Sequence, residues 1–169
     1  LAHLSRHPDA AVDALVLLAV NVANPSWRAA GVRSLQRRAG IELMRVLTRL
    51  FGRLPARRLR YGTDDEAPSY VEDFVRNGRA RRWRARDDFD YWAALPRVDR
   101  PVLALVGGGD RFMSPPADAR ALAARIPGAR FRVVGDSDHM GLVLDERARP
   151  AWDQAADFIR SIRPAPARR

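Results

Sequence analysis

The chain has 169 residues, 47% of them apolar, with no cysteine and a formal net charge of +10. This length suits one globular domain with a sizeable core, and the lack of cysteine excludes a disulfide framework and a thiolate metal site. No run approaches 18 consecutive apolar residues, so we expect no membrane span. Residues 1–11 do not have the pattern of a secretory leader, and the cytoplasm is the default prediction for location.

The positive charge is concentrated in one segment. All thirty basic residues are arginine, and residues 28–100 hold 18 of them against 10 acidic residues. A surplus of this kind raises nucleic acid and acidic membranes as partners. Because lysine is absent and alanine is abundant, the arginine content also fits a coding bias over the whole chain. We therefore predict no nucleic-acid partner.

Residues 1–20 predict the end of a helix followed by a strand. Leu1 and Leu4 have helical spacing, and Pro8 stops that helix. Since the chain opens inside this pattern and not on methionine, we expect further sequence upstream. Residues 12–20 are nearly all apolar and rich in Val and Leu, which is typical of a strand buried on both faces of a parallel sheet.

Two helices are predicted in the middle of the chain. Residues 41–54 form the more regular one, with arginines on one side and an apolar face made of Leu43, Leu47, Leu50 and Leu54. A basic amphipathic helix can lie on a membrane, but we interpret this one as a surface helix that covers a core. Residues 69–78 form the second helix, with Ser69 as its N-cap, Glu72 completing a capping box and Gly78 at its end.

Short strands and helices alternate after residue 100. The pattern predicts strands at residues 102–106 and 131–134, and helices at residues 114–128 and 149–164. Together with the strand at residues 12–20, this order is typical of an α/β fold with a parallel sheet.

Two polar side chains follow strands of this predicted sheet. Asp110 comes after residues 102–106 through three glycines, and His139 comes after residues 131–134 through Gly135. The carboxyl ends of parallel strands lie at one edge of a sheet, where sites of open α/β proteins form. Because neighbouring strands lie about 5 Å apart, the carboxylate and the imidazole can meet within hydrogen-bond distance. Such a contact fixes the tautomer of a histidine and stabilises its charged form.

Four other polar residues near these loops have simpler interpretations. Asp136 and Asp138 could orient His139, but we prefer to interpret them as a polar loop and a local cap. Ser114 and Ser137 do not lie on a glycine-flanked turn between a strand and a helix. Neither serine is therefore predicted to be a nucleophile.

Two further groups could bind ligands. His3 and His7 have the i, i+4 spacing of a metal pair, but no third ligand stands near them in the sequence, and we predict no metal site. The run RARRWRAR at residues 79–86 interleaves arginine with Trp83 and could grip phosphates or carboxylates. We interpret this run as a solvated surface.

The stretch from RPVLALVGGGD to SDHMGLVL resembles the C-terminal part of an α/β-hydrolase. In that family a strand ends in Gly-x-x-Asp, a helix follows, and a second strand leads to the catalytic histidine. Gly107-x-x-Asp110 matches the acid loop, and Asp-His-Met-Gly at residues 138–141 matches the histidine loop, 29 residues further on. Residues 1–20, with His-Pro ahead of the strand, resemble the stretch after the nucleophile helix of the family.

The resemblance implies a division of the chain. Residues 1–20 and 96–164 would form the C-terminal portion of the α/β-hydrolase core, and residues 21–95 fall where the family inserts a variable helical cap. Residues 165–169 are predicted to be a disordered tail. Trp27, Trp83, Trp92 and Met140 are candidates for the substrate pocket, because aromatic and apolar residues in and beside the cap often line it in this family.

The resemblance also implies an activity, the hydrolysis of an ester, amide or similar acyl bond of a small molecule, without metal or organic cofactor. His139 would be the general base and Asp110 the residue that holds it. The sequence contains no G-x-S-x-G, so the serine nucleophile and the oxyanion hole are expected upstream of Leu1. We predict that these 169 residues alone do not hydrolyse esters. Related families use an aspartate nucleophile, and the choice between serine and aspartate stays open.

Two alternatives come from other classes of protein. One is a binding module without catalysis that uses the basic segment on an anionic ligand, lipid or nucleic acid. The other is an interaction subunit whose missing strands come from another chain, because an exposed strand at residues 12–20 would demand a partner.

Overall fold

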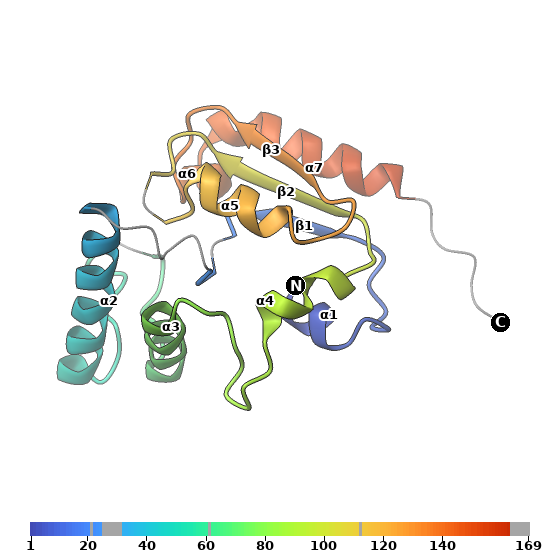
Figure 1. The fold of residues 1–169 in the computed structure, drawn as a ribbon. Helices are drawn as coiled ribbons and strands as arrows, with labels where there is room; N and C mark the ends of the chain where they lie inside the picture. Colours follow the sequence, from blue (N-terminus) through green and yellow to red (C-terminus); the bar gives the residue numbers. More distant parts are fainter. Residues whose placement is uncertain (21, 25–31, 61, 112, 163–169) are drawn as a thin grey trace. The chain divides into compact units, whose positions relative to one another are not determined.

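The computed structural model describes residues 1–20, 22–24, 32–60, 62–111 and 113–162 (Figure 1). The predicted tail at residues 165–169 lies outside the described residues. The chain divides into two compact units. Leu1–Val22 and Tyr91–Arg169 form what we call the sheet unit, and Ala23–Asp90 form the helical unit.

A parallel sheet of three strands lies at the centre of the sheet unit. β1 (Leu15–Leu18), β2 (Val102–Gly107) and β3 (Arg130–Val134) follow one another in the order β1-β2-β3, and all pairs are parallel. The predicted α/β fold with a parallel sheet is thereby confirmed. The strand predicted at residues 12–20 is shorter than expected.

The three strands differ in burial because of their places in the sheet. Every residue of β2 is buried, since this strand has a neighbour on each side. β1 has one neighbour among the described strands, and of its four residues Leu17 alone is buried. The prediction of a strand buried on both faces was therefore wrong for β1. β3 is also at an edge, and Val133 is 46% exposed.

Helices cover both faces of the sheet. α5 (Pro116–Ala123) contacts β2 and β3 from one side, and α7 (Arg149–Ser161) lies on the other (Figure 1). Phe158 of α7 belongs to one apolar cluster with Leu103 and Leu105 of β2. The helix predicted at residues 114–128 ends early, because the amides of Arg125 and Ile126 bond three residues back in a tighter turn.

Short elements complete the sheet unit. They are α1 (Ala2–Arg6), α4 (Tyr91–Ala94), α6 (Gly141–Leu144) and the 3₁₀ turns η2 (Leu95–Arg97) and η3 (Glu146–Ala148). α1 confirms the helix predicted before Pro8 and contacts α4. Trp152 of α7 donates its indole N–H to the carbonyl of Leu142 at 2.9 Å, which ties α6 to α7. Ile159 of α7 is 60% exposed.

The helical unit consists mainly of two helices. α2 (Val32–Phe51) and α3 (Pro68–Ala80) lie side by side (Figure 1), and α2 begins nine residues before the predicted start. Their shared core contains Ala23, Ile41, Leu54, Ala56, Val71 and Val75. Among the described residues, no helix is long and apolar enough to cross a membrane.

The apolar face predicted for residues 41–54 was wrong in part. Ile41 and Thr48 are the buried residues of α2 at the contact with α3, whereas Leu43 and Leu50 are 55% and 72% exposed. The helix carries apolar residues on two sides, so its leucine pattern alone did not show which side packs. Leu54, just past the helix, is buried as expected.

The predicted capping box of α3 was also wrong. The N-cap is Ala67, and no side chain caps the first turn. Pro68 occupies the first helical position, where its fixed backbone angle favours the helix, so α3 begins before Ser69 can act as a cap. The helix runs past Gly78 to Ala80 and ends at Arg81, which has a left-handed conformation with φ 52°.

Candidate active site

Asp110 and His139 meet at the carboxyl ends of β2 and β3. Nδ1 of His139 lies 2.8 Å from Oδ2 of Asp110. The Asp110 side chain is 2% exposed and the His139 side chain 30%, so the carboxylate is shielded while part of the imidazole remains accessible. The structure thus brings together two residues that lie 29 positions apart in the sequence.

Three glycines allow this approach. Gly108 donates its amide to the carbonyl of Gly135 at 2.9 Å, and Gly109 donates to the carbonyl of Ser137 at 3.1 Å. A Cβ on Gly108 would stand 2.5 Å from the carbonyl oxygen of Gly135, and a Cβ on Gly107 or Gly109 would also collide with the backbone of the histidine loop. The two loops therefore pack backbone against backbone, and side chains at these positions would separate Asp110 from His139.

The second oxygen of Asp110 is held by its own loop. Oδ1 accepts the amides of Met113 at 3.0 Å and Ser114 at 2.9 Å. Ser114 is fully buried, and its hydroxyl donates to the carbonyl of Val20 at 3.1 Å, just past β1. The carboxylate is therefore fixed from both sides, and the Ser114 hydroxyl is already committed to a structural bond.

These contacts set the charge of Asp110. Burial raises the pKa of the Asp110 carboxyl, but the hydrogen bond to His139 and the amides of Ser114 and Met113 lower it, and the net pKa lies below its ordinary value. Asp110 is therefore ionised at neutral pH and accepts hydrogen bonds only. Its partner Nδ1 must then carry the proton, which leaves Nε2 of a neutral His139 free to accept one.

The neighbouring acidic residues do not hold His139. Oδ1 of Asp138 accepts the amide of Gly141 at 2.7 Å, which is the local cap expected from the sequence. Asp136 is exposed. Ser137 contributes the backbone carbonyl that accepts the amide of Gly109.

An open hollow of about 650 Å³ adjoins the histidine loop. It is lined by Asp136, Ser137, Asp138, Met140, Gly141, Leu144, Asp145, Glu146 and Arg147. Met140 is the one predicted pocket residue among them. The sequence did not indicate Leu144, Asp145, Glu146 and Arg147, because they are mostly exposed residues of short turns, which show no periodic pattern in the sequence.

The three remaining pocket candidates, Trp27, Trp83 and Trp92, belong to different parts of the chain. Trp92 belongs to α4 of the sheet unit, where the guanidinium of Arg125 lies 5.9 Å from its ring centroid. Trp83 belongs to the helical unit. Trp27 lies outside the described residues. The assignment of these three tryptophans to a substrate pocket therefore stays a prediction.

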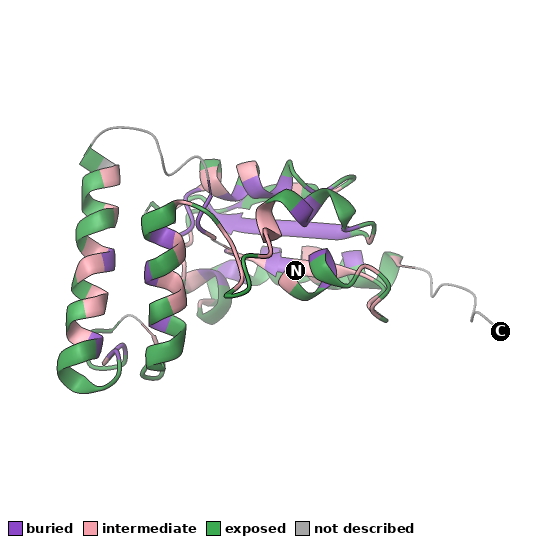
Figure 2. Ribbon diagram, turned by 60° about the horizontal axis from the view of Figure 1, so that its bottom comes forward, coloured by how far each residue is buried: buried purple, intermediate pink, exposed green. Residues whose placement is uncertain are grey.

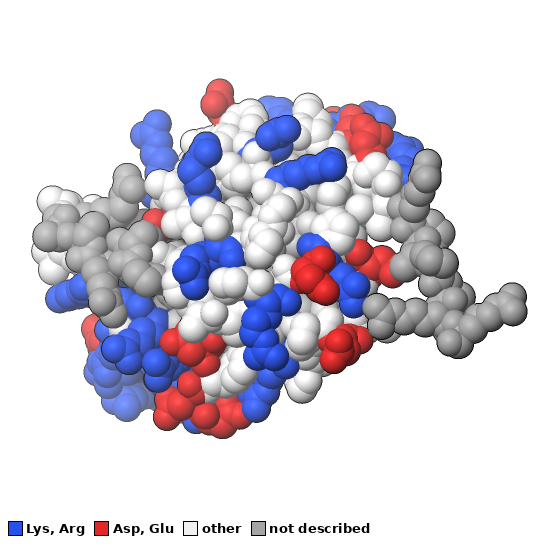
Figure 3. All heavy atoms as spheres, turned by 45° about the vertical axis from the view of Figure 1, so that its right-hand side comes forward, with Lys and Arg blue, Asp and Glu red and all other residues white. Residues whose placement is uncertain are grey.

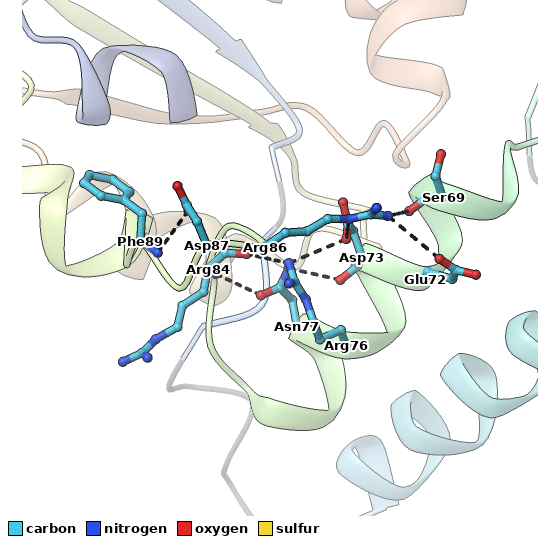
Figure 4. Close-up of polar contacts among 9 residues, drawn as sticks. All are labelled: Ser69, Glu72, Asp73, Arg76, Asn77, Arg84, Arg86, Asp87 and Phe89. Carbon is cyan, nitrogen blue, oxygen red and sulfur yellow. Dashed lines mark hydrogen bonds and ion pairs between the residues drawn. The ribbon is translucent and has the colours of Figure 1, made fainter.

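Intramolecular ion pairs occupy much of the arginine run at residues 79–86. Arg84 pairs with Asp90 at 3.2 Å. Figure 4 shows Arg86, which pairs with Asp73 at 3.0 Å. Asn77 accepts the amide of Arg84 at 2.8 Å, so α3 holds the following loop. These bonds engage several guanidinium groups of the run, which favours the predicted solvated surface over a site for phosphates.

The two N-terminal histidines form no metal site with their surroundings in the described chain. The rings of His3 and His7 lie 4.8 Å apart between centroids. Within the described ranges, no group of three or more His, Cys, Asp or Glu residues could hold a metal ion.

Solved structures resemble the whole described fold. An esterase from Exiguobacterium antarcticum matches 94% of this chain with a TM-score of 0.59 and 18% identity, over 61% of its own length. An esterase from Thermogutta terrifontis matches 95% with a TM-score of 0.52 and 19% identity, over 60% of its length. The chain has the α/β-hydrolase fold.

The likeness is one of fold, since these sequences are less than 20% identical to this one. An acetylester hydrolase from Corynebacterium glutamicum matches 93% of this chain over 56% of its own length, with a TM-score of 0.50 and 19% identity. The chain spans about 60% of the length of these proteins. No protein-family model and no curated protein matches the chain.

Proposed function

We propose that the chain is part of an α/β-hydrolase that cleaves an ester, amide or similar acyl bond of a small molecule. Asp110 and His139 would be the acid and the base of its catalytic triad. The observation that carries the proposal is the 2.8 Å contact between a shielded, ionised carboxylate and a partly accessible imidazole. The esterase and ester hydrolase names of the three similar structures support the same class of bond.

The chemistry follows from the tautomer that Asp110 imposes. Nε2 of His139 would take the proton of the attacking hydroxyl and return it to the leaving group. Asp110 would stabilise the imidazolium that forms between these steps. Water activated by the same nitrogen would then clear the acyl group from the nucleophile.

The nucleophile and the oxyanion hole are proposed to precede Leu1 in a longer protein. The sequence contains no G-x-S-x-G, and Ser114 is buried in a structural bond. Without these parts the 169 residues lack the covalent route and the main electrostatic contribution to catalysis. We propose a serine, because the similar structures are named for ester hydrolysis.

The helical unit is proposed to act as the cap that selects the substrate. It interrupts the sheet unit between Val22 and Tyr91, close to the predicted cap boundaries of 21 and 95. Trp83, Trp92 and Met140 remain proposed contacts of the substrate. A cytoplasmic location also remains a prediction from the sequence.

Turnover of p-nitrophenyl esters by the longer protein tests this proposal. His139→Ala and Asp110→Asn should each lower kcat/KM by about 10³-fold or more. Asp136→Asn, an exposed carboxylate in the same loop, is the matched control and should leave turnover unchanged. Full activity of His139→Ala would refute the assignment of the base. Ester hydrolysis by the 169 residues alone that depends on His139 would refute the proposal that the nucleophile precedes Leu1.

A further inference from the structure

α2 carries an apolar stripe that faces solvent along its whole length. The stripe consists of Val32, Leu35, Ala39, Leu43, Val46 and Leu50, which follow one another at intervals of three or four residues. At 3.6 residues per turn they fall within a sector of about 80°. All six are exposed. The exposed fractions are 72% for Val32, 68% for Leu35, 55% for Leu43, 45% for Val46 and 72% for Leu50. Figure 2 shows how much of α2 is exposed.

The core of the helical unit does not use this stripe. Ile41 and Thr48 are buried on the other side of α2, where α3 packs. α2 packs on α3 with one side and carries a second apolar face, which has no partner among the described residues of the helical unit.

Arginines flank the stripe and are available for a ligand. Arg38 and Arg49 lie along one edge, both exposed, and neither makes an ion pair within the described part of the chain. Glu42 lies near the same edge, but Arg79 and Arg45 neutralise it. The guanidinium groups of Arg38 and Arg49 can therefore reach past the apolar side chains toward an anionic surface.

Further arginines surround the C-terminal end of α2. A hollow of about 860 Å³ is lined there by Leu47, Phe51, Arg53, Pro55, Arg57, Arg58, Leu59 and Asp65. Arg53 pairs with Asp65 at 2.9 Å. Arg57 and Arg58 are exposed, and within the described ranges their guanidinium groups make no ion pair, although the backbone amide of Arg57 donates to Asp65 at 3.3 Å. Apolar and cationic groups thus occur together over this end of the helical unit.

The net charge of the helical unit favours a lipid bilayer over a second copy of the chain as the partner of the stripe. Ala23–Asp90 contains 16 arginines and 9 acidic residues, so two copies of this surface would repel each other. Basic side chains are also spread over the face of the protein shown in Figure 3, with acidic side chains among them. Lipid phosphates carry the opposite charge, and a bilayer offers an apolar layer beneath them for the stripe.

We infer that α2 docks the protein on the surface of an anionic lipid bilayer. The stripe enters the boundary between headgroups and acyl chains, and Arg38, Arg49, Arg57 and Arg58 contact lipid phosphates. The helix lies in the plane of the interface and does not span the membrane. This inference does not depend on the hydrolase activity proposed above.

Sedimentation with lipid vesicles measures the docking. The 169-residue chain should bind vesicles of phosphatidylcholine with about one third phosphatidylglycerol, and high salt should weaken this binding. Binding to vesicles of phosphatidylcholine alone should be weaker by about tenfold or more. Leu43→Asn with Leu50→Asn should lower binding to the anionic vesicles by about tenfold or more. Ile159→Asn, an exposed apolar residue of α7, is the matched control and should not change it.

A second measurement reports the position of the helix without removing the stripe. The chain has no cysteine, so Leu50→Cys and Ile159→Cys each give one site for an environment-sensitive fluorophore. Anionic vesicles should shift the emission to the blue at position 50 and not at position 159.

Arginine substitutions test the contribution of charge. Arg38→Gln with Arg49→Gln should lower binding to the anionic vesicles by about tenfold. The control, Arg130→Gln with Arg132→Gln, replaces two exposed arginines of β3 and should lower this binding less.

Three outcomes would overturn the inference. One is the absence of binding to anionic vesicles by the folded chain. Another is binding that Leu43→Asn with Leu50→Asn leaves intact. The third is a stripe-dependent dimer in size-exclusion chromatography without vesicle binding, because it would make this face an interface between two copies.

Discussion

Replacing Asp110 by asparagine should change the tautomer of His139 while leaving the fold intact. In the native chain the ionised carboxylate can only accept, so Nδ1 of His139 donates to it across 2.8 Å. An asparagine can keep its carbonyl oxygen on the amides of Met113 and Ser114. Its NH₂ group then faces Nδ1, which must accept, and the proton moves to Nε2. The nitrogen that would act as the base is thereby blocked.

The expected loss of stability follows from the bonds involved. Asp110→Asn replaces charge-assisted hydrogen bonds by neutral ones, and their difference amounts to about 1–3 kcal/mol of unfolding free energy at neutral pH. The pKa of Asp110 is lowered in the folded chain, so the stabilisation by its charge is complete above the unfolded value of about 3.9. It is lost as the pH falls through the lower, folded pKa. The difference between the two proteins should therefore shrink in acid.

Two measurements on the 169-residue chain check this prediction. Nitrogen-15 NMR distinguishes the two tautomers of His139, and urea unfolding at neutral and acidic pH gives the stability difference. Asp136→Asn serves as the control and should change neither quantity, because Asp136 is exposed. A native His139 with its proton on Nε2, or a tautomer that Asp110→Asn leaves unchanged, would refute the reasoning.

Three further substitutions test the surroundings of the site. Gly109→Ala should lower the unfolding free energy by about 2 kcal/mol or more, since its Cβ would collide with the carbonyl of Asp136. Gly62→Ala, whose Cβ would have its nearest contact at 3.6 Å, is the control and should lower the unfolding free energy less. Equal urea midpoints of the two variants would contradict this. Leu105→Ala, at a residue 2% exposed, should cost about 2–5 kcal/mol in urea unfolding, and a value below 1 kcal/mol would mean that β2 is not the packed centre of the sheet. Ser114→Ala should cost about 1–2 kcal/mol through the lost bond to Val20 and leave ester turnover of the longer protein intact, whereas abolished turnover would give Ser114 a chemical role.

The sequence predicted the parts of the structure in which local pattern and tertiary packing agree. The run at residues 102–106 is apolar throughout and becomes the fully buried β2. The three glycines after it are needed for the approach of the histidine loop, so their place in the sequence marks the site. Asp110 and His139 follow strand ends, and parallel pairing places these ends side by side, so that the two side chains can meet.

The sequence did not predict features that depend on which neighbours exist. Leu43 and Leu47 belong to one apolar pattern, yet Leu43 is 55% exposed, because α3 packs on a different side of α2. β1 was expected to be buried on both faces, but it has one neighbour among the described strands and only Leu17 is buried. The pocket residues were chosen by residue type, and their contact with a substrate stays a prediction.

Covalent labelling by a fluorophosphonate tests the central proposal most directly, because this reagent reacts with a serine that a histidine has activated. The longer protein should be labelled on a serine preceding Leu1, and His139→Ala should abolish the labelling while Asp136→Asn leaves it unchanged. Asp110→Asn should slow it by about 10³-fold. Labelling that proceeds equally well without His139 would contradict the account, because Asp110 and His139 would then be a structural pair and not the acid and base of a hydrolase.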